Sequence, residues 1–273
     1  MSQIAITHSL FTIASVLYLI SGISTIRSMS KEGGKASAYV RWLTLVGFVC
    51  HGAAIFSDMF VQDMIFFGFA MALSLTLFIA VAVFLVESFW RSVSGLMGVF
   101  LVVAAAGVLA PTLFPGNGVP SQQWSLLFKT HLLLALSAYS FMLIAVVQAV
   151  LFTMVEKQLK DPTRVTSNGL LSNMPNLMAM ERILYRIIAC GFICLSALLV
   201  LGAFATFETH GVLFMTDHKT ILTWVSWIVF AVLLIGRRFF GWRNRKALAW
   251  FWVGFSTLVV AYFLYSFIME LFL

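Results

Sequence analysis

The stretch KTHLLLALSAYSFMLIAVVQAVLF, residues 129–152, shows most directly what kind of fold this chain adopts. After Lys129 no charged residue appears until Glu156, and His131 lies near the start of this apolar run. An α-helix rises about 1.5 Å per residue and the hydrocarbon core of a bilayer is about 30 Å thick, so residues 130–155 are long enough to cross it. The stretch therefore predicts a transmembrane helix that begins beside a histidine.

The rest of the chain has the same character. Hydrophobic residues make up 62% of the 273 residues and charged residues only 10%, with a mean hydropathy of +1.02, which excludes a soluble globular domain. We expect an all-α, polytopic integral membrane helical bundle that forms a single transmembrane domain over residues 1–273, with 156–182 as a cytoplasmic connecting segment. The apolar runs predict eight spans, at about 7–26, 41–57, 64–87, 92–111, 130–155, 183–206, 220–237 and 247–269.

The basic residues predict the orientation of these spans. Fifteen of the seventeen Lys and Arg residues fall in one alternating set of loops, and the other set holds only Lys129 and Lys219. Because positively charged short loops stay in the cytoplasm, both termini are predicted to lie outside it, as in a multi-pass protein of the bacterial inner membrane. The net charge of +7 therefore reflects topology and gives no reason to invoke nucleic acid.

All the histidines fall toward the predicted non-cytoplasmic side. A neutral imidazole is a general ligand for iron, copper and zinc, so this one-sided set suggests a metal or haem site. His51 lies inside the second predicted span, where it has two interpretations: a functional group, as a second site or relay, or a neutral imidazole bonded to a neighbouring helix. The full set is His8, His51, His131, His210 and His218.

Haem fits these residues better than a bare metal ion does. A zinc site needs three or four closely spaced His or Cys ligands, whereas haem needs one or two axial imidazoles, an aromatic slot and cations for its propionates. The competing interpretation is an interfacial histidine, solvated loop histidines and an ordinary aromatic belt. The candidates are His131 with His218 or His210 as iron ligands, Trp124, Phe207 and Phe214 as the slot, Lys129 and Lys219 as propionate partners, and Asp217 as a carboxylate beside His218.

Four stretches, taken in order, resemble the CcsA/HemX/YpjD group of cytochrome c assembly and haem-handling membrane proteins. Each resembles a pattern of that group: a Gly-Phe span with a histidine, a His followed by a Ser-x-Tyr helix, a segment entering a Gly-Phe helix, and a loop followed by a span and a Gly-Trp-Arg turn. The stretches are VGFVCHGAAIF at 46–56, residues 129–152 quoted above, MPNLMAMERILYRIIACGFICLSALLVLGA at 174–203, and ETHGVLFMTDHKTILTWVSWIVFAVLLIGRRFFGWRNRKAL at 208–248.

The chain also departs from that group's cytochrome c synthases, whose tryptophan-rich loop forms a haem platform. Glu208, Gly211, Asp217 and Lys219 match that loop, whereas His210, Phe214 and Thr216 replace its tryptophans, and Ile235 replaces a histidine of the following span. The resemblance therefore implies the HemX/YpjD branch more than a complete synthase.

These observations lead to one main functional hypothesis and a rival. The main hypothesis is an inner-membrane protein that binds or handles haem on its periplasmic side in cytochrome c maturation, with the bilayer, haem and other assembly proteins as partners. The rival is a non-enzymatic membrane partner or regulator, acting in tetrapyrrole synthesis or stabilising another membrane protein, for which segment 156–182 would matter. A small-solute permease is less favoured because no inverted repeat is evident. No motif assigns a reaction, so we expect a role other than enzymatic catalysis.

Overall fold

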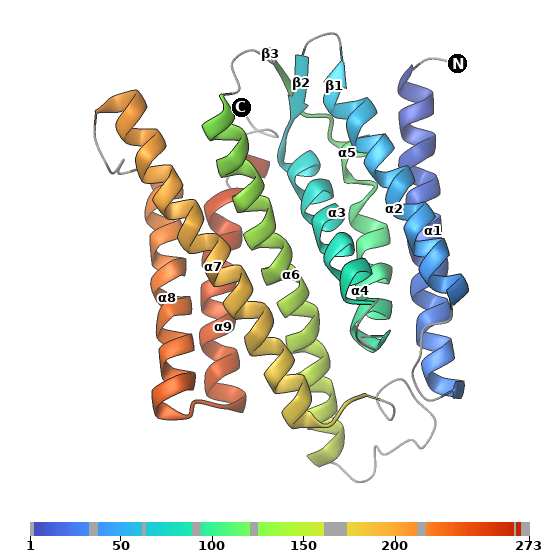
Figure 1. Cartoon of the computed structure of the whole chain (residues 1–273), viewed down its shortest axis with the longest axis vertical. Helices are drawn as coiled ribbons and strands as arrows, with labels where there is room; N and C mark the ends of the chain where they lie inside the picture. Colours follow the sequence, from blue (N-terminus) through green and yellow to red (C-terminus); the bar gives the residue numbers. More distant parts are fainter. Residues whose placement is uncertain are drawn as a thin grey trace. The chain divides into compact units, whose positions relative to one another are not determined.

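Long apolar helices form most of the molecule. The computed structural model describes residues 3–32, 38–61, 64–88, 94–120, 125–160, 174–211, 217–264 and 266–268. Within these ranges, eight helices are long and apolar enough to cross a membrane (Figure 1), so the predicted all-α membrane fold is confirmed. Contacts divide the chain into two compact units. Unit 1 comprises Met1–Ser121 with Leu143–Leu184, and unit 2 comprises Gln122–Met142 with Tyr185–Leu273.

Unit 1 contains four of the long helices and a small sheet. Its helix α2 has 22 residues, longer than the roughly 17 expected from hydropathy, because three residues before and two residues after the expected span continue the helix. The C-terminal part of α6, from Leu143, and the start of α7, to Leu184, also belong to this unit. The elements are α1 (Gln3–Glu32), α2 (Ala38–Met59), β1 (Phe60–Val61), β2 (Met64–Phe67), α3 (Phe69–Glu87), α4 (Ser94–Gly107), α5 (Ala110–Leu113), β3 (Asn117–Pro120) and part of α6 (Leu126–Lys160).

The small sheet formed by β1, β2 and β3 differs from what the sequence predicts at two places in unit 1. The third span was expected to begin at residue 64, but residues 64–67 form β2 and the helix begins at Phe69. The stretch 112–128 is rich in Pro, Gly and Asn, which predicts an irregular loop or interfacial segment, but Asn117–Pro120 pairs antiparallel with β2, which also pairs with β1. Pairing between these strands gives hydrogen-bond partners to backbone N–H and C=O groups that lie beyond the ends of the helices. Hydropathy cannot predict this pairing, because it depends on residues far apart in the chain.

Several polar side chains buried in unit 1 bond to backbone carbonyls, whereas the buried Ser21 hydroxyl has no partner among the described residues. The hydroxyls of Thr25, Thr44 and Thr76 donate to backbone carbonyls four residues earlier in their own helices. The amide of Gln148 in α6 donates to the Met180 carbonyl of α7 over 2.9 Å. Such bonds are required in an apolar surrounding, where water cannot supply the missing partner.

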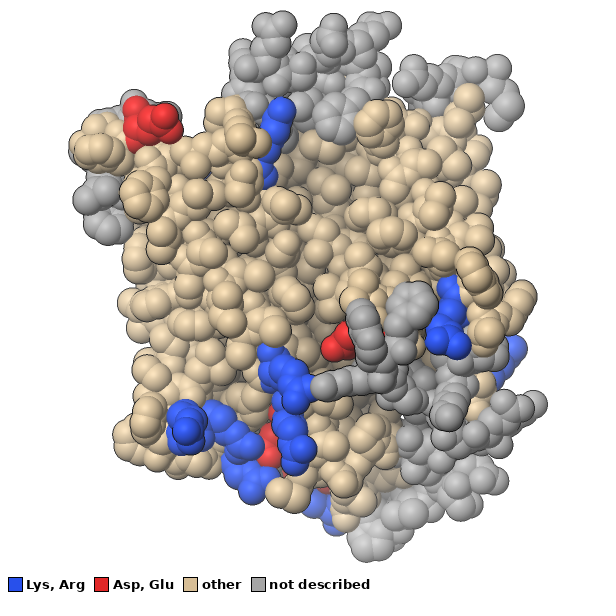
Figure 2. All heavy atoms as spheres, viewed as in Figure 1, with Lys and Arg blue, Asp and Glu red and all other residues tan. Residues whose placement is uncertain are grey.

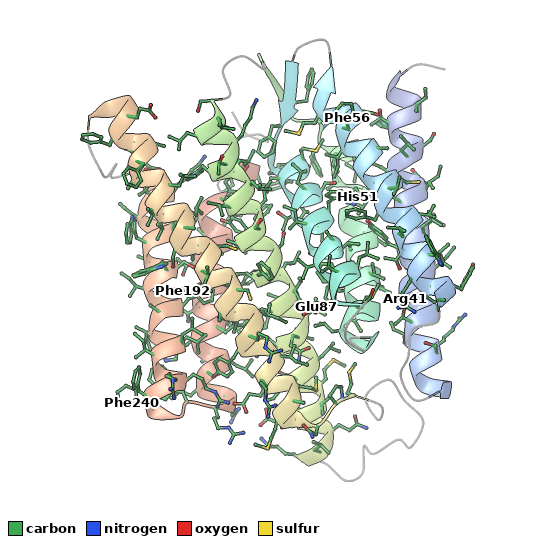
Figure 3. The ribbon with its side chains drawn as sticks, viewed as in Figure 1. Arg41, His51, Phe56, Glu87, Phe192 and Phe240 are labelled. Atoms are coloured by element: carbon green, nitrogen blue, oxygen red, sulfur yellow. The ribbon has the colours of Figure 1, made fainter. Side chains whose placement is uncertain are left out.

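Unit 2 is built from the other helices, which carry most of the candidate site. Its helix α8 has 23 residues, again more than the roughly 17 expected. Side chains join the helices: Trp227 Nε1 donates to Ser196 Oγ over 2.9 Å while the Trp227 ring stacks on Phe192 of α7, and Ser226 donates to the Gly254 carbonyl. Figure 3 labels Phe192 on α7. The elements are the first part of α6, α7 (Leu177–His210) from Tyr185, α8 (His218–Phe240), α9 (Asn244–Val259) and η4 (Val260–Leu264), a π-helical turn.

Both ends of the expected connecting segment 156–182 belong to long helices. Helix α6 continues to Lys160, where Lys160 Nζ lies 2.6 Å from Glu156 Oε1, and α7 begins at Leu177. Residues 161–173 lie outside the described part of the chain. The cytoplasmic location of this segment stays a prediction.

Candidate functional site at one end of unit 2

The chain topology of unit 2 brings most predicted site residues to one end of that unit. Helix α6 begins there, α7 ends there, α8 begins there and α9 passes into η4 there, because successive long helices alternate in direction (Figure 1). The predicted site residues lie in the first two turns or the last turn of these helices, or cap them: Lys129, His131, His210, Asp217, His218 and Lys219. We refer to this part of the molecule as the histidine end of unit 2.

His131 is the most distinctive residue of the histidine end. It lies in the second turn of α6, is half-buried, and its Nδ1 is buried with no hydrogen-bond partner among the described residues. The ring edge faces Gly202 of α7: a Cβ built on Gly202 would lie 3.2 Å from His131 Cε1 and 3.6 Å from Nδ1. Burying a polar atom without a hydrogen-bond partner costs free energy. Such an atom in a native protein calls for an explanation, for example a role in binding a ligand.

Lys129 and Lys219 are both exposed, and only Lys219 has a described aromatic neighbour. Its Nζ lies 5.9 Å from the ring centroid of Tyr262, within the range of a cation–π interaction. Tyr262 belongs to the π-helical turn η4, and π-turns occur frequently at functional sites. The sequence analysis missed Tyr262, because its only signal was one aromatic among many in the last span.

Tyr139 connects α6 to this π-turn. Its hydroxyl donates to the Leu258 carbonyl over 2.8 Å, and its ring lies against those of Tyr262 and Phe263, with centroids 6.1 and 5.1 Å away. A π-turn changes the helical hydrogen-bond pattern, so a carbonyl next to it can accept a side-chain donor. Tyr139 thereby holds the turn that carries Tyr262 beside Lys219.

Asp217 caps α8 and is not the partner of His218. Its carboxylate accepts from the backbone N–H and the hydroxyl of Thr220, as expected of an N-cap residue. Although partial burial raises the pKa of Asp217, the hydrogen bonds from Thr220 and nearby backbone N–H groups outweigh it and lower that pKa below its ordinary value. His218 is exposed, and the expected hydrogen bond between the two does not occur among the described contacts.

Replacing Asp217 with alanine is expected to lower the free energy of unfolding by about 1 kcal/mol, the usual cost of an N-cap, whereas asparagine should keep most of it. Since the folded-state pKa of Asp217 is lowered, its ionised form contributes stability above the ordinary aspartate pKa that is lost as pH falls through the folded value. Thermal unfolding in detergent, compared at neutral pH and below pH ~4, measures both effects. An Asp217→Asn variant with the same acid sensitivity as wild type would contradict this account.

The remaining members of the predicted slot are only partly described. His210 ends α7, but its side chain, like all of Trp124 and Phe214, lies outside the described part of the structure. Phe207 is 55% exposed on the last turns of α7. The aromatic slot therefore stays a prediction.

His51 belongs to unit 1 and has both of its ring nitrogens engaged. Nε2 lies 2.8 Å from Ser74 Oγ of α3, and Nδ1 lies 3.4 Å from the Tyr18 hydroxyl of α1. The ring is fully buried, and Phe11 and Phe78 pack edge-on against it (Figure 3). A neutral imidazole supplies one donor and one acceptor, so these two hydroxyls satisfy it completely. This arrangement matches the second interpretation, an imidazole bonded to neighbouring helices.

The histidine end provides some of the groups that a haem site requires. Within the described ranges, no group of three or more His, Cys, Asp or Glu side chains is placed to hold a metal ion. Haem requires fewer protein ligands than such a group provides. The His131 imidazole is not engaged in a described hydrogen bond and so could serve as a ligand, and Lys129 and Lys219 supply exposed cations for carboxylates. The described residues therefore fit haem through one axial histidine.

Comparisons with known proteins identify the family of this chain. The family model described as "Cytochrome C assembly protein" matches residues 39–273. The Inner membrane protein YpjD of Escherichia coli (strain K12) is 29% identical over 170 residues, which cover 62% of this chain and 62% of that protein. The Cytochrome c biogenesis protein CcsA of Rippkaea orientalis is 32% identical over 107 residues, covering 36% of this chain and 31% of that protein.

The aligned part thus spans less than two thirds of these relatives. No solved structure matches the chain. The resemblance to the CcsA/HemX/YpjD group is confirmed, because the family model covers most of the sequence. This multi-pass membrane chain belongs to the cytochrome c assembly protein family.

Proposed function

We propose that this protein binds haem at the histidine end of unit 2 and handles it during cytochrome c assembly. The observation that carries the proposal is the buried Nδ1 of His131, which has no hydrogen-bond partner among the described residues and lies where Gly202 leaves room for the imidazole edge. Haem supplies an iron that takes one or two axial ligands. His131 would be one ligand, with His218 or His210 as candidates for the other.

The cations at this end would receive the haem propionates. Lys219, beside the Tyr262 ring, and Lys129, two residues before His131, are exposed ammonium groups at the ends of their helices. Membership of a cytochrome c assembly family supports haem as the ligand, as does the similarity to proteins named for cytochrome c biogenesis. The role that we propose is one of binding and presentation.

The charge pattern supports placing the histidine end on the periplasmic side of the bacterial inner membrane. Fifteen of the seventeen Lys and Arg residues belong to the opposite set of connections. A cysteine introduced at Asn117 should accordingly react with an impermeant thiol reagent added to intact cells. Protection of that cysteine, together with labelling of one at Asn168, would reverse the orientation.

The test of haem binding is an absorption spectrum of the purified protein, oxidised and reduced, after expression with ample haem. A Soret band that co-purifies with the protein, with sharpened visible bands on reduction, is the expected result. A spectrum without a Soret band would overturn the proposal. The alternative of a non-enzymatic membrane partner or regulator would then take its place.

A further inference from the structure

The turn between α8 and α9, at the opposite end of unit 2 from His131, concentrates positive charge. Between residues 218 and 269 the sequence contains no Asp or Glu. Lys and Arg side chains gather at the lower left of Figure 2, where Figure 1 places this turn. The positive-inside preference and the α8 dipole explain the sign of the charge, but they do not require any particular geometry. We define the cationic turn by Arg237, Arg238, Arg243, Arg245 and Lys246.

The backbone of the cationic turn is tightly built. Gly241 ends α8 in the left-handed region, with φ of 62°, and the N–H of Trp242 donates to the Gly236 carbonyl over 3.1 Å. The Trp242 indole lies directly on Gly236: a Cβ built there would lie 2.4 Å from the ring. The indole also stacks on Trp250 of α9, with ring centroids 5.6 Å apart. The turn is therefore a packed structure and not a loose charged loop.

One aromatic ring of α7 and one of the turn itself lie against two of the cations. The Arg237 guanidinium lies 4.7 Å from the ring centroid of Tyr185 in α7, and the Tyr185 hydroxyl donates to the Trp242 carbonyl over 3.1 Å. Lys246 Nζ lies 4.1 Å from the Trp242 ring centroid. Ordering a charged side chain before a ligand arrives lowers the entropy cost of binding. An arginine guanidinium binds phosphate oxygens through its N–H groups.

Apolar surface lies next to these cations. Phe239 is 76% exposed and Phe240 is 74% exposed, and Phe240 points away from the ribbon (Figure 3). Both immediately precede the turn, so in a membrane they would contact acyl chains while the cations reach headgroup depth. A ligand that matches both features carries a phosphate and a hydrocarbon body. A nucleic acid or an acidic protein would match the charge and leave the phenylalanines without a role.

We propose that the cationic turn binds the headgroup phosphate of an anionic phospholipid. Arg237 and Lys246, held by Tyr185 and Trp242, are the ordered cations, and Arg245 adds an exposed charge beside them. Phe239 and Phe240 contact the acyl chains of the same lipid. The site is independent of haem binding, because it lies at the other end of the unit.

The test is native mass spectrometry of the purified full-length protein in micelles containing equal amounts of phosphatidylglycerol and phosphatidylcholine. The wild-type protein is expected to retain phosphatidylglycerol at least fivefold more than phosphatidylcholine. Each cation near an anionic lipid surface contributes about fivefold in affinity, so Arg237→Gln/Arg245→Gln/Lys246→Gln should abolish the preference. The matched control, Lys129→Gln/Lys219→Gln at the histidine end, should retain it. An equal preference in wild type and the triple variant would overturn the proposal.

A second variant tests whether the ordered position of Arg237 matters in addition to its charge. Tyr185→Leu removes the ring beside Arg237 and the bond to the Trp242 carbonyl without changing any charge, and it should reduce the preference about threefold. A full preference in Tyr185→Leu would overturn the ordered site, provided its unfolding temperature matches wild type. Inorganic phosphate added at millimolar concentration should not displace the lipid. Displacement by phosphate alone would show a simple anion site and contradict the lipid assignment.

Discussion

Replacing His131 with alanine is expected to remove most of the Soret absorbance that co-purifies with the protein. The substitution deletes the imidazole whose buried Nδ1 has no described hydrogen-bond partner, and with it the best-placed axial ligand. Loss of an axial ligand weakens haem retention or leaves a shifted spectrum. The measurement is the ratio of Soret to protein absorbance in wild type and variant, purified in parallel and read oxidised and reduced.

The control for this substitution is His8→Ala, which changes an exposed histidine of α1 in unit 1 and should leave the spectrum unchanged. Imidazole added to His131→Ala should restore part of the Soret band, because the deleted ring leaves space beside Gly202. Rescue by imidazole distinguishes ligation from a packing defect. Identical spectra in wild type and His131→Ala would remove His131 from the site.

Replacing His51 with alanine is expected to lower the free energy of unfolding by about 3–5 kcal/mol, as for other large rings deleted from a core. The ring is fully buried against Phe11, Tyr18 and Phe78, so its loss leaves a cavity as well as two unpaired hydroxyls. Hydrogen bonds between membrane helices contribute only about 0.6 kcal/mol each, so packing should account for most of the loss. Equilibrium unfolding in detergent measures the effect.

Two further variants test this balance. His51→Leu keeps most of the volume and loses only the bonds to Tyr18 and Ser74, so it should cost about 1 kcal/mol. His8→Ala, at an exposed position, should change stability by less than about 0.5 kcal/mol. A loss in His51→Leu equal to that in His51→Ala would show that the hydrogen bonds dominate. A change in the Soret band of His51→Leu would instead return His51 to the haem site.

Features that depend on residues close together in the sequence, such as the number of spans and the start of a helix, were predicted correctly. The number of spans depends on local hydropathy, and the start expected near Thr220 for the seventh span agrees with the Asp217 cap. Two expectations failed, one of them because a partner far along the chain decides. Residues 64–67 are as apolar as a span, yet pairing with Asn117–Pro120 holds them as a strand. The other concerns Asp217, whose carboxylate accepts from Thr220 as the N-cap of α8, while no described hydrogen bond joins it to His218.

Hydropathy along the chain is enough to identify an eight-helix membrane protein, since burial in lipid requires long apolar helices whatever their packing. It is also enough to bring six predicted site residues to one end of unit 2, because consecutive spans alternate in direction. Only the tertiary structure distinguished His51 from His131. Both are histidines in apolar surroundings, but side chains from α1 and α3 satisfy the first, and Gly202 of α7 faces the second without bonding it. Such contacts join residues far apart in the chain, and no local pattern records them.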